Sequence, residues 1–306
     1  MTSQELNPGL IVASHGRHVW VESPDGERRI CHSRGKKSLG VVGDRVLWEA
    51  SGHEGTIERI DVRKNLFYRQ DELRTKSFAS NLDQILILIA AEPVFSNSQL
   101  SRALIAAEAA GIPPVIALNK ADLIDPFAQA WTWLEPYRRM GYSVCPLSLR
   151  QPANGDRETL MQMMAGKTSL VLGPSGAGKS TLINLLKPGA LAQTGEISRA
   201  LGSGKHTTTS TTWYWLDDER TTAVIDSPGF QEFGLRHIDP ARLATYMPDL
   251  HAHADHCKFY NCSHLHEPGC GVISAMKNPS GPDEISLNRY KIYCELHAEL
   301  SQPDRY

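Results

Sequence analysis

The sequence lacks the two patterns that mark a chain for the membrane or for secretion. It has no apolar run of about 18 residues, and its start is not a basic stretch followed by an apolar one. We therefore expect a cytoplasmic protein without a membrane partner. An excess of one charge is also lacking, because 32 basic and 34 acidic residues leave a net charge of -2. A nucleic-acid surface would therefore have to be a local patch.

Cysteine is scarce too, with six in 306 residues. Three of the six are scattered, which argues against a disulfide framework, and three cluster beside histidines between residues 257 and 270. Hydrophobic residues at 41% and charged residues at 22% are ordinary for a folded globular protein. The length is enough for two or three domains of roughly 100 to 200 residues each.

Short β-branched runs separated by turn residues fill the chain from Leu10 to about Tyr68, which predicts a small barrel or sandwich. This region also gathers basic residues near two rings: Arg17, Arg28, Arg29, Arg34, Lys36 and Lys37, with Trp20 and His32. The set is compatible with a nucleic-acid face. The charged surface of a purely structural barrel explains it equally well, so both interpretations stay open.

From Asn81 to Phe233, apolar runs alternate with helical patterns, which is typical of a doubly wound α/β sheet. The expected parallel strands are Gln84–Ala90, Pro113–Lys120, Tyr142–Ser148, Thr168–Gly173 and Thr221–Ser227, with helices at Ser98–Ala110 and Ser180–Leu186. Residues 63–78 carry five Lys or Arg residues and no clear hydrophobic period. We expect a linker or a basic loop there.

The last part, from Asp239, is rich in His and Cys and becomes amphipathic from about Glu284 to Leu300. So small a region would need an added cross-link to fold well. We therefore expect a multi-domain protein with an all-β barrel at residues 1–72, an α/β domain at 73–236 and a mainly helical domain at 237–306.

The clearest motif is Gly173-Pro-Ser-Gly-Ala-Gly-Lys-Ser180, which fits G-x-x-x-x-G-K-[ST] between an apolar run and a helical segment. Glycines let backbone N–H groups surround a phosphate, and the following helix adds its positive N-terminal end. Lys179 is expected to reach the β- and γ-phosphates, and the Ser180 hydroxyl to bind Mg²⁺.

A second motif, Asn119-Lys120-Ala121-Asp122, ends an apolar run at a place where doubly wound folds bind ligands. The Asp122 carboxylate can accept hydrogen bonds from N1–H and the 2-amino group of guanine, and adenine offers neither donor there. Lys120 can lay its stem along the base, and Asn119 can bond the base or tie loops together. Alone the tetrapeptide is a weak signal, but beside a phosphate loop it predicts GTP.

The order of the motifs is unusual, because Asn119 comes before Gly173, whereas ordinary GTPases carry the phosphate loop first. We interpret this as circular permutation, which keeps the packed strands and moves the cut to an exposed loop. Asp226-Ser-Pro-Gly229 fits D-x-x-G, where Asp226 can support Mg²⁺ and the Gly229 amide can sense a γ-phosphate. This switch is then the last part of the α/β domain, so the nucleotide state would act directly on the C-terminal domain.

A polar segment at residues 202–209 lies between these motifs, and Thr208 or Thr209 would complete the Mg²⁺ shell as a first switch. A plain Gly/Ser/Thr linker is the alternative. Phe230 follows D-x-x-G where Ras-like enzymes carry the glutamine that orients water, and an apolar side chain cannot do this. His206 is a candidate replacement, with a solvent-exposed histidine of no catalytic role as an equal possibility.

The cluster Cys257-x4-Cys262-x-His264-x5-Cys270 supplies three thiolates and one imidazole, which matches a closed tetrahedral zinc site. Four protein ligands leave no position for water, so the metal would be structural. His264 has the best spacing, although other histidines lie near: His251, His253, His256 and His266. Free thiols in an aqueous tail are the alternative.

Together these motifs resemble the bacterial ribosome small subunit-dependent GTPase family (RsgA, also called YjeQ): N-K-A-D from Asn119, G-P-S-G-A-G-K-S from Gly173, K-H-T-T-T from Lys205, D-S-P-G-F from Asp226, and the Cys₃His cluster. The resemblance covers almost the whole chain. It implies an RNA-binding OB-fold barrel, a permuted P-loop GTPase and a zinc domain. It also implies a cytoplasmic protein, monomeric by default, that binds the 30S subunit and its 16S rRNA and assists late maturation, with slow GTP hydrolysis stimulated by the subunit.

Carried over by position, the GTP contacts of the family fall on Asn119, Lys120, Ala121, Asp122, Ser148, Gly173, Pro174, Ser175, Gly176, Ala177, Gly178, Lys179, Ser180, Thr181, Asp226 and Gly229. The Mg²⁺ contacts fall on Ser180, Thr208 and Asp226, catalysis on Lys179 and His206, and the zinc ligands on Cys257, Cys262, His264 and Cys270. The chain departs from the family in having Lys205 for an arginine and Leu149 for a small alanine.

Two other functions compete with a subunit-stimulated GTPase. One is an RNA-binding module that uses GTP as a ligand with negligible turnover, which Phe230 favours. The other is a P-loop kinase or ATPase, which N-K-x-D disfavours.

Overall fold

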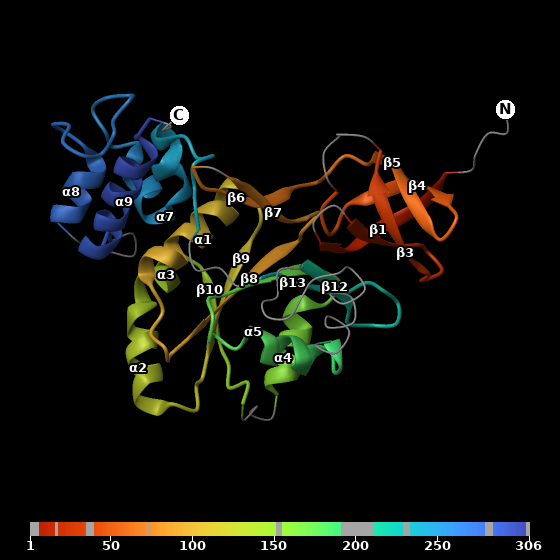
Figure 1. Cartoon of the computed structure of the whole chain (residues 1–306). Helices are drawn as coiled ribbons and strands as arrows, with labels where there is room; N and C mark the ends of the chain where they lie inside the picture. Colours follow the sequence, from red (N-terminus) through yellow and green to blue (C-terminus); the bar gives the residue numbers. More distant parts are fainter. Residues whose placement is uncertain are drawn as a thin grey trace.

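The structure is a computed structural model that describes residues 6–15, 18–34, 40–72, 74–150, 155–190, 211–228, 233–278 and 284–303. Three parts are visible in Figure 1: a barrel on the right, a sheet with helices below, and a helical group on the left. Within the described residues, no helix has the length and apolar character to cross a bilayer.

The first five strands close into a barrel: β1 (Asn7–His15), β2 (His18–Glu22), β3 (Arg28–Ser33), β4 (Arg45–Ser51) and β5 (Glu54–Ile60). Their order is β1-β2-β3-β5-β4, and β4 returns to pair with β1. Strand alternation turns residues such as Val19 and Val21 inward, and closure leaves no unpaired edge. This strand order and the closure of β4 on β1 are those of an OB-fold, so the predicted barrel is confirmed.

Residues 63–78 are not the linker or basic loop that we expected. They contribute most of an antiparallel hairpin made of β6 (Leu66–Gln70) and β7 (Thr75–Ser80). The turn lies between these strands, so the expected division after residue 72 falls inside it. The hydrophobic signal was weak because few positions face the core, chiefly Phe67 and Phe78, whose rings lie 5.6 Å apart.

The α/β part contains all five predicted parallel strands, in the spatial order β10-β9-β8-β11-β13. They are β8 (Gln84–Ala90), β9 (Pro114–Asn119), β10 (Ser143–Pro146), β11 (Thr168–Leu172) and β13 (Ala223–Asp226). An antiparallel strand that we did not predict, β12 (Thr211–Trp215), pairs with β13. The helices are α1 (Asn97–Ala109), α2 (Ile124–Trp133), α3 (Glu135–Arg139), α4 (Asp156–Met164) and α5 (Lys179–Leu186).

Both faces of this sheet are covered, as the doubly wound prediction requires. Strand β8 is buried along its whole length. Its side chains alternate between two cores, because Ile85 packs in the core that includes Leu104 of α1, and Leu86 in the core that includes Leu182 of α5. A near-continuous apolar run is the sequence signature of such a strand.

The barrel and the α/β sheet are continuous through one strand pair. Strand β12 pairs antiparallel with β1, where Ala13 lies opposite Thr212 and Ser14 opposite Thr211. Figure 1 places β12 and β13 directly beneath the barrel. A displacement of β12 would therefore move strand β1 of the barrel.

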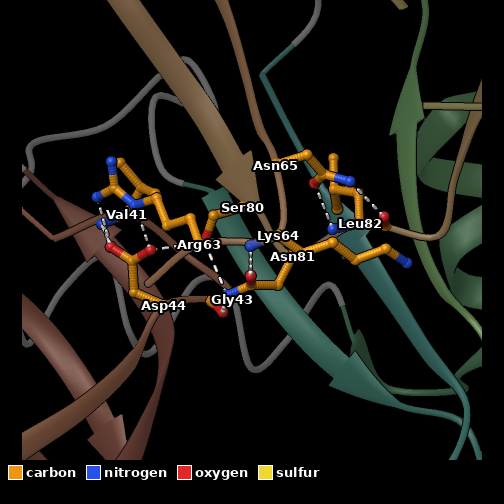
Figure 2. Close-up of polar contacts among 9 residues, drawn as sticks. All are labelled: Val41, Gly43, Asp44, Arg63, Lys64, Asn65, Ser80, Asn81 and Leu82. Carbon is orange, nitrogen blue, oxygen red and sulfur yellow. Dashed lines mark hydrogen bonds and ion pairs between the residues drawn. The ribbon is translucent and has the colours of Figure 1, made fainter. Parts of the chain in front are cut away.

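A buried carboxylate fixes the second connection between these parts (Figure 2). Asp44 is fully buried and accepts two hydrogen bonds of 2.7 Å from Arg63, one of 2.6 Å from the Ser80 hydroxyl and one of 2.8 Å from the Val41 amide. These partners come from the barrel, from the segment that leaves it and from the end of β7. Asp44 therefore holds three segments together immediately before β8.

The C-terminal part is helical, as predicted: a 3₁₀ helix η1 (Pro240–Tyr246), α7 (Pro248–Ala254), α8 (Gly271–Lys277) and α9 (Leu287–Leu300). A buried arginine joins it to the α/β part. Arg289 of α9 donates to both carboxylate oxygens of Asp249 at 2.8 and 2.9 Å and to the hydroxyl of Ser101 in α1 at 2.8 Å.

We predict that Asp44→Ala lowers the free energy of unfolding by about 3 kcal/mol, because it leaves Arg63 and two further donors without their buried acceptor. The measurement is urea unfolding of the full chain. Asp61→Ala, which removes an exposed carboxylate of the same segment, is the control and should cost less than about 0.5 kcal/mol. Equal effects of the two substitutions would contradict the role given to Asp44.

Candidate nucleotide and metal sites

The phosphate-loop motif lies between β11 and α5, and the close approach of neighbouring segments explains two of its glycines. A Cβ at Gly173 would lie 2.6 Å from the carbonyl oxygen of Leu88. Gly178 has a φ of +102°, and a Cβ there would lie 2.4 Å from the side-chain nitrogen of Asn119. The loop therefore requires glycine because it packs against β8 and against the N-K-A-D segment.

The Asn119 side chain connects the loops of the site. It is 4% exposed, and its amide nitrogen donates to the Ala177 carbonyl at 2.9 Å across a separation of 58 residues. Its amide oxygen accepts from the Leu149 backbone amide at 3.1 Å. We expected Asn119 either to bond the base or to connect loops. In this structure its side chain connects two loops. The motifs that stand in reversed order along the sequence meet in one place.

The carboxylate of Asp122, which we expect to read the base, is held by a residue of the loop after β10. The Ser148 hydroxyl donates to Asp122 at 2.9 Å, and the Ala121 amide donates to the Leu147 carbonyl at 2.9 Å. Lys120 has a positive φ of 69°, and its ammonium donates to the backbone carbonyl of Glu92. The bond from Ser148 fixes the Asp122 carboxylate. Because Asp122 is exposed, the carboxylate is also open to a ligand.

Leu149, the departure from the family pattern, is buried among apolar residues. Its side chain is 4% exposed and packs in the same core as Leu160 and Met164 of α4. A bulky residue is tolerated at this position because it points into the protein.

Lys179 and Asp226 form an ion pair between the start of α5 and the end of β13. Their side chains are 11% and 4% exposed. Ser180, the next residue of α5, is exposed. The arrangement brings together an ammonium group that can bind phosphate and a carboxylate that can bind a divalent cation, and it does so beside the phosphate loop.

Several residues singled out in the sequence lie outside the described residues: Lys205, His206, Thr208, Thr209, Gly229 and Phe230. The assignments of His206 to catalysis, Thr208 to Mg²⁺ and Gly229 to the γ-phosphate stay predictions.

The described basic residues of the suggested nucleic-acid face are all paired with carboxylates. The pairs are Arg28–Glu22 at 2.7 Å, Arg29–Glu27 at 2.9 Å, His32–Glu54 at 2.7 Å and Arg34–Glu58 at 2.7 Å. Arg17, Lys36 and Lys37 lie outside the described residues. Glu22 is buried and also accepts from Trp215 at 2.7 Å, so its pair with Arg28 is fixed. The other three pairs are more exposed, and exposed pairs contribute only about 0 to 1 kcal/mol each, so a phosphate could replace those carboxylates at little cost.

The four predicted metal ligands converge. The possible ligand atoms of Cys257, Cys262, His264 and Cys270 all lie within 4.8 Å of one another. The sulfur atoms of Cys257 and Cys270 are 3.8 Å apart, and Nδ1 of His264 lies 3.4 Å from the first and 3.5 Å from the second. A tetrahedral site with metal–ligand bonds of about 2.3 Å to sulfur and about 2.0 Å to nitrogen has edges of about 3.8 and 3.5 Å. The cluster could therefore hold a tetrahedral metal ion.

The surroundings also suit a metal. Burial raises the pKa of the Cys262 thiol to about 12 and lowers that of His264, so a bound cation would be needed to stabilise the thiolates. The Gly271 amide donates to the Cys257 sulfur at 3.3 Å, and the Ile273 amide to the Cys270 sulfur at 3.4 Å. Such donors stabilise sulfur that carries negative charge.

The ligand loop around His264 is organised by Glu267, which sequence reasoning missed. Its carboxylate accepts from the Ser263 amide at 2.8 Å, from the Ser263 hydroxyl at 2.5 Å, and from the amides of Leu265 and His266 at 3.2 Å. No sequence signal distinguishes this glutamate from other acidic residues of the region.

Comparison with known proteins identifies the family of the chain. The RsgA GTPase family matches residues 60–236. A Small ribosomal subunit biogenesis GTPase RsgA from Variovorax paradoxus is 68% identical over 297 residues, which cover 97% of this chain and 93% of the relative. The protein of the same name from Paraburkholderia xenovorans is 48% identical over 299 residues, covering 96% and 93%.

Two solved structures are similar over almost their whole length. YjeQ from Thermotoga maritima has a TM-score of 0.72 and 29% identity, covering 97% of this chain and 99% of its own. YloQ, described as a circularly permuted GTPase, has a TM-score of 0.69 and 27% identity, covering 100% and 99%. With one family matching more than half of the sequence and a relative this similar over nearly all of it, the chain belongs to the RsgA family of circularly permuted GTPases.

Proposed function

We propose that this GTPase binds the small (30S) ribosomal subunit, assists its late maturation, and hydrolyses GTP to GDP and phosphate with stimulation by the subunit and release on hydrolysis. The observation that carries the nucleotide part is the contact of Asn119 with Ala177, which joins the base-reading and phosphate-binding loops in one site. The ribosomal part is supported by the names of relatives that share up to 68% of the residues.

In this proposal Asp122 selects guanine by accepting from N1–H and the 2-amino group, with Lys120 along the base. Lys179 leaves its partner Asp226 and neutralises charge on the β- and γ-phosphates as the bond to the γ-phosphate breaks. Ser180, Thr208 and Asp226 would hold Mg²⁺, which supplies further charge neutralisation when bound. His206 is the candidate for orienting the attacking water.

The nucleotide state would reach the other domains through the flanks of the two switches. The first switch ends where β12 begins, and β12 pairs with β1 of the barrel. The second is followed by Phe233, whose ring lies 5.7 Å from that of Phe67 and 6.0 Å from that of Phe78 in the hairpin. Its carbonyl accepts from Arg102, which also pairs with Glu299 of α9. Both flanks are thus tied to parts outside the nucleotide site.

The Cys₃His cluster is proposed to hold one structural zinc ion. The near-tetrahedral spacing of its described ligands and the soft donor set favour zinc over harder cations. The domain assignments are proposed with it, with the first boundary in the turn of the β6–β7 hairpin: an RNA-binding barrel at residues 1–72, the GTPase domain at 73–236 and the zinc domain at 237–306. The barrel is the proposed contact to 16S rRNA, and the protein is proposed to act in the cytoplasm as a monomer.

A GTP-regulated RNA-binding module with negligible turnover is the second candidate, because Phe230 stands where Ras-like enzymes carry a glutamine. We predict instead that 30S subunits raise the rate of GTP hydrolysis several-fold, measured as phosphate release with and without subunits. Lys179→Ala should abolish the stimulated rate. A rate that does not change at saturating subunit would favour the binding module.

Asp122→Asn is predicted to weaken GTP binding by about tenfold to a hundredfold and to strengthen binding of xanthosine triphosphate, because the amide donates where the carboxylate accepts. The dissociation constants of both nucleotides provide the measurement. Asp125→Asn removes an exposed carboxylate at the start of α2 and should leave both unchanged. An unchanged preference for GTP in the Asp122 variant would remove Asp122 as the base reader.

For the metal site, we predict that Glu267→Ala weakens zinc binding by about tenfold or more, because the backbone around His264 loses its common acceptor. Competition with a chromogenic chelator measures the affinity. Asp255→Ala, an exposed carboxylate just before Cys257, is the matched control. If the Glu267 variant retains zinc as firmly as the control, the organising role of Glu267 is wrong.

A further inference from the structure

Three successive backbone amides after strand β10 each donate to a different acceptor. The Leu147 amide donates to the β9 backbone at 2.8 Å, the Ser148 amide to a carboxylate oxygen of Asp156 at 3.1 Å, and the Leu149 amide to the Asn119 side chain at 3.1 Å. The first and third acceptors belong to β9 and its end. Asp156, in contrast, belongs to helix α4, which follows this loop in the sequence.

We propose that Asp156 is a positioning residue for the guanine base, which it influences through Ser148 and Leu149. The Ser148 amide is thus held by an acceptor on α4, whereas the amides on either side of it are held by β9 and its end. The inference rests on the proposed guanine site and adds a residue that lies outside its sequence motifs.

The position of Asp156 is well fixed. It is the first residue of α4, directly after Gly155, which has a φ of +115° and allows the chain to turn into the helix. Leu160 and Met164 of the same helix are fully buried in the core that also contains Leu149. A movement of Asp156 relative to the loop would therefore disturb that core, and its carboxylate is a rigid anchor.

The anchored loop presents two groups toward the base. The Ser148 hydroxyl donates to Asp122 at 2.9 Å and so fixes the carboxylate proposed to read N1–H and the 2-amino group. The Leu149 amide is the second group. In this structure it donates to the Asn119 side chain. The O6 atom of guanine is an acceptor on the same edge of the base as N1–H. Asp156 thus supports both the donor and the acceptor that a guanine edge requires.

A hydrogen bond from a backbone amide to a carboxylate is stronger than one between neutral groups. Only part of its contribution is expected to appear in nucleotide binding, since the loop is also held by Asn119 and the β9 backbone. We therefore expect Asp156→Ala to raise the dissociation constant of GDP about tenfold. At saturating GTP the turnover number should be unchanged while KM rises, because no group that contacts the phosphates is altered.

The experiment compares Asp156→Ala, Asp156→Asn and Glu158→Ala in the full chain. Glu158 is an exposed carboxylate in the same first turn of α4, so its removal makes the same change in charge near the helix start. Asp156→Asn keeps an oxygen that can accept from the Ser148 amide and should stay within about threefold of the unmodified protein. Each variant is titrated with GDP and with 2-aminopurine riboside diphosphate, which keeps the 2-amino group but lacks O6 and N1–H.

Support requires that Asp156→Ala weakens GDP binding more than binding of the 2-aminopurine nucleotide, and that Glu158→Ala leaves both within about twofold of the unmodified protein. The proposal is overturned if Asp156→Ala matches Glu158→Ala, if Asp156→Asn is as weak as Asp156→Ala, or if both nucleotides lose affinity equally. The proposed function fails separately, if the unmodified protein does not prefer GDP to ADP.

Discussion

The nucleotide site depends on the hydrogen bond from the Asn119 amide to the Ala177 carbonyl, because it joins two loops whose order along the chain is reversed. Permutation leaves this contact possible since strands β9, β8 and β11 are neighbours in one parallel sheet. The loops that follow parallel strands emerge at the same edge, whichever strand comes first in the sequence. Gly178 completes the constraint, because any side chain there would meet Asn119. Spatial adjacency of the strands, and not chain order, therefore defines this GTPase.

The same sheet explains how a small site is connected to two flanking parts. Strand β12 is shared, since it pairs with β13 on one side and with β1 of the barrel on the other. On the opposite flank, the Gln70 amide donates to the Gly234 carbonyl at 3.1 Å, which ties the hairpin to the chain just beyond the D-x-x-G motif. Asp44 of the barrel is bonded to Arg63, in the segment that leaves the barrel, and to Ser80 at the end of β7. These bonds restrict tilting of the barrel relative to the sheet. A change at the site therefore has defined mechanical routes outward.

The sequence allowed the five parallel strands, the barrel and the cluster of three Cys and one His that could hold a metal to be predicted, because each has a strong local signature: long apolar runs, regular turns, or close Cys and His spacing. Strand β12 was missed, since one of its two pairing partners, β1, is distant in sequence, and the β6–β7 hairpin was missed, since few of its residues face a core. The nucleotide motifs could be recognised in the sequence, and their binding roles stay predictions. Asp156 and Glu267 could not be singled out, because a carboxylate that accepts from a backbone amide leaves no pattern in the chain. Such contacts depend on tertiary placement alone.

Three little-exposed acid–base pairs in this protein differ in how fully their carboxylates are satisfied, and the difference separates structure from function. Asp44 accepts four hydrogen bonds, and Asp249 accepts two from Arg289 and a third from the Leu250 amide at 3.2 Å. Within the described residues, the Asp226 carboxylate has a single hydrogen-bond partner, Lys179. Removing a saturated carboxylate from its donors costs several kcal/mol, whereas an unsaturated one retains lone pairs for a new cation. The first two pairs therefore stabilise the junctions at the barrel and at the C-terminal helices, and the third is the pair that we propose opens when a nucleotide and its metal bind.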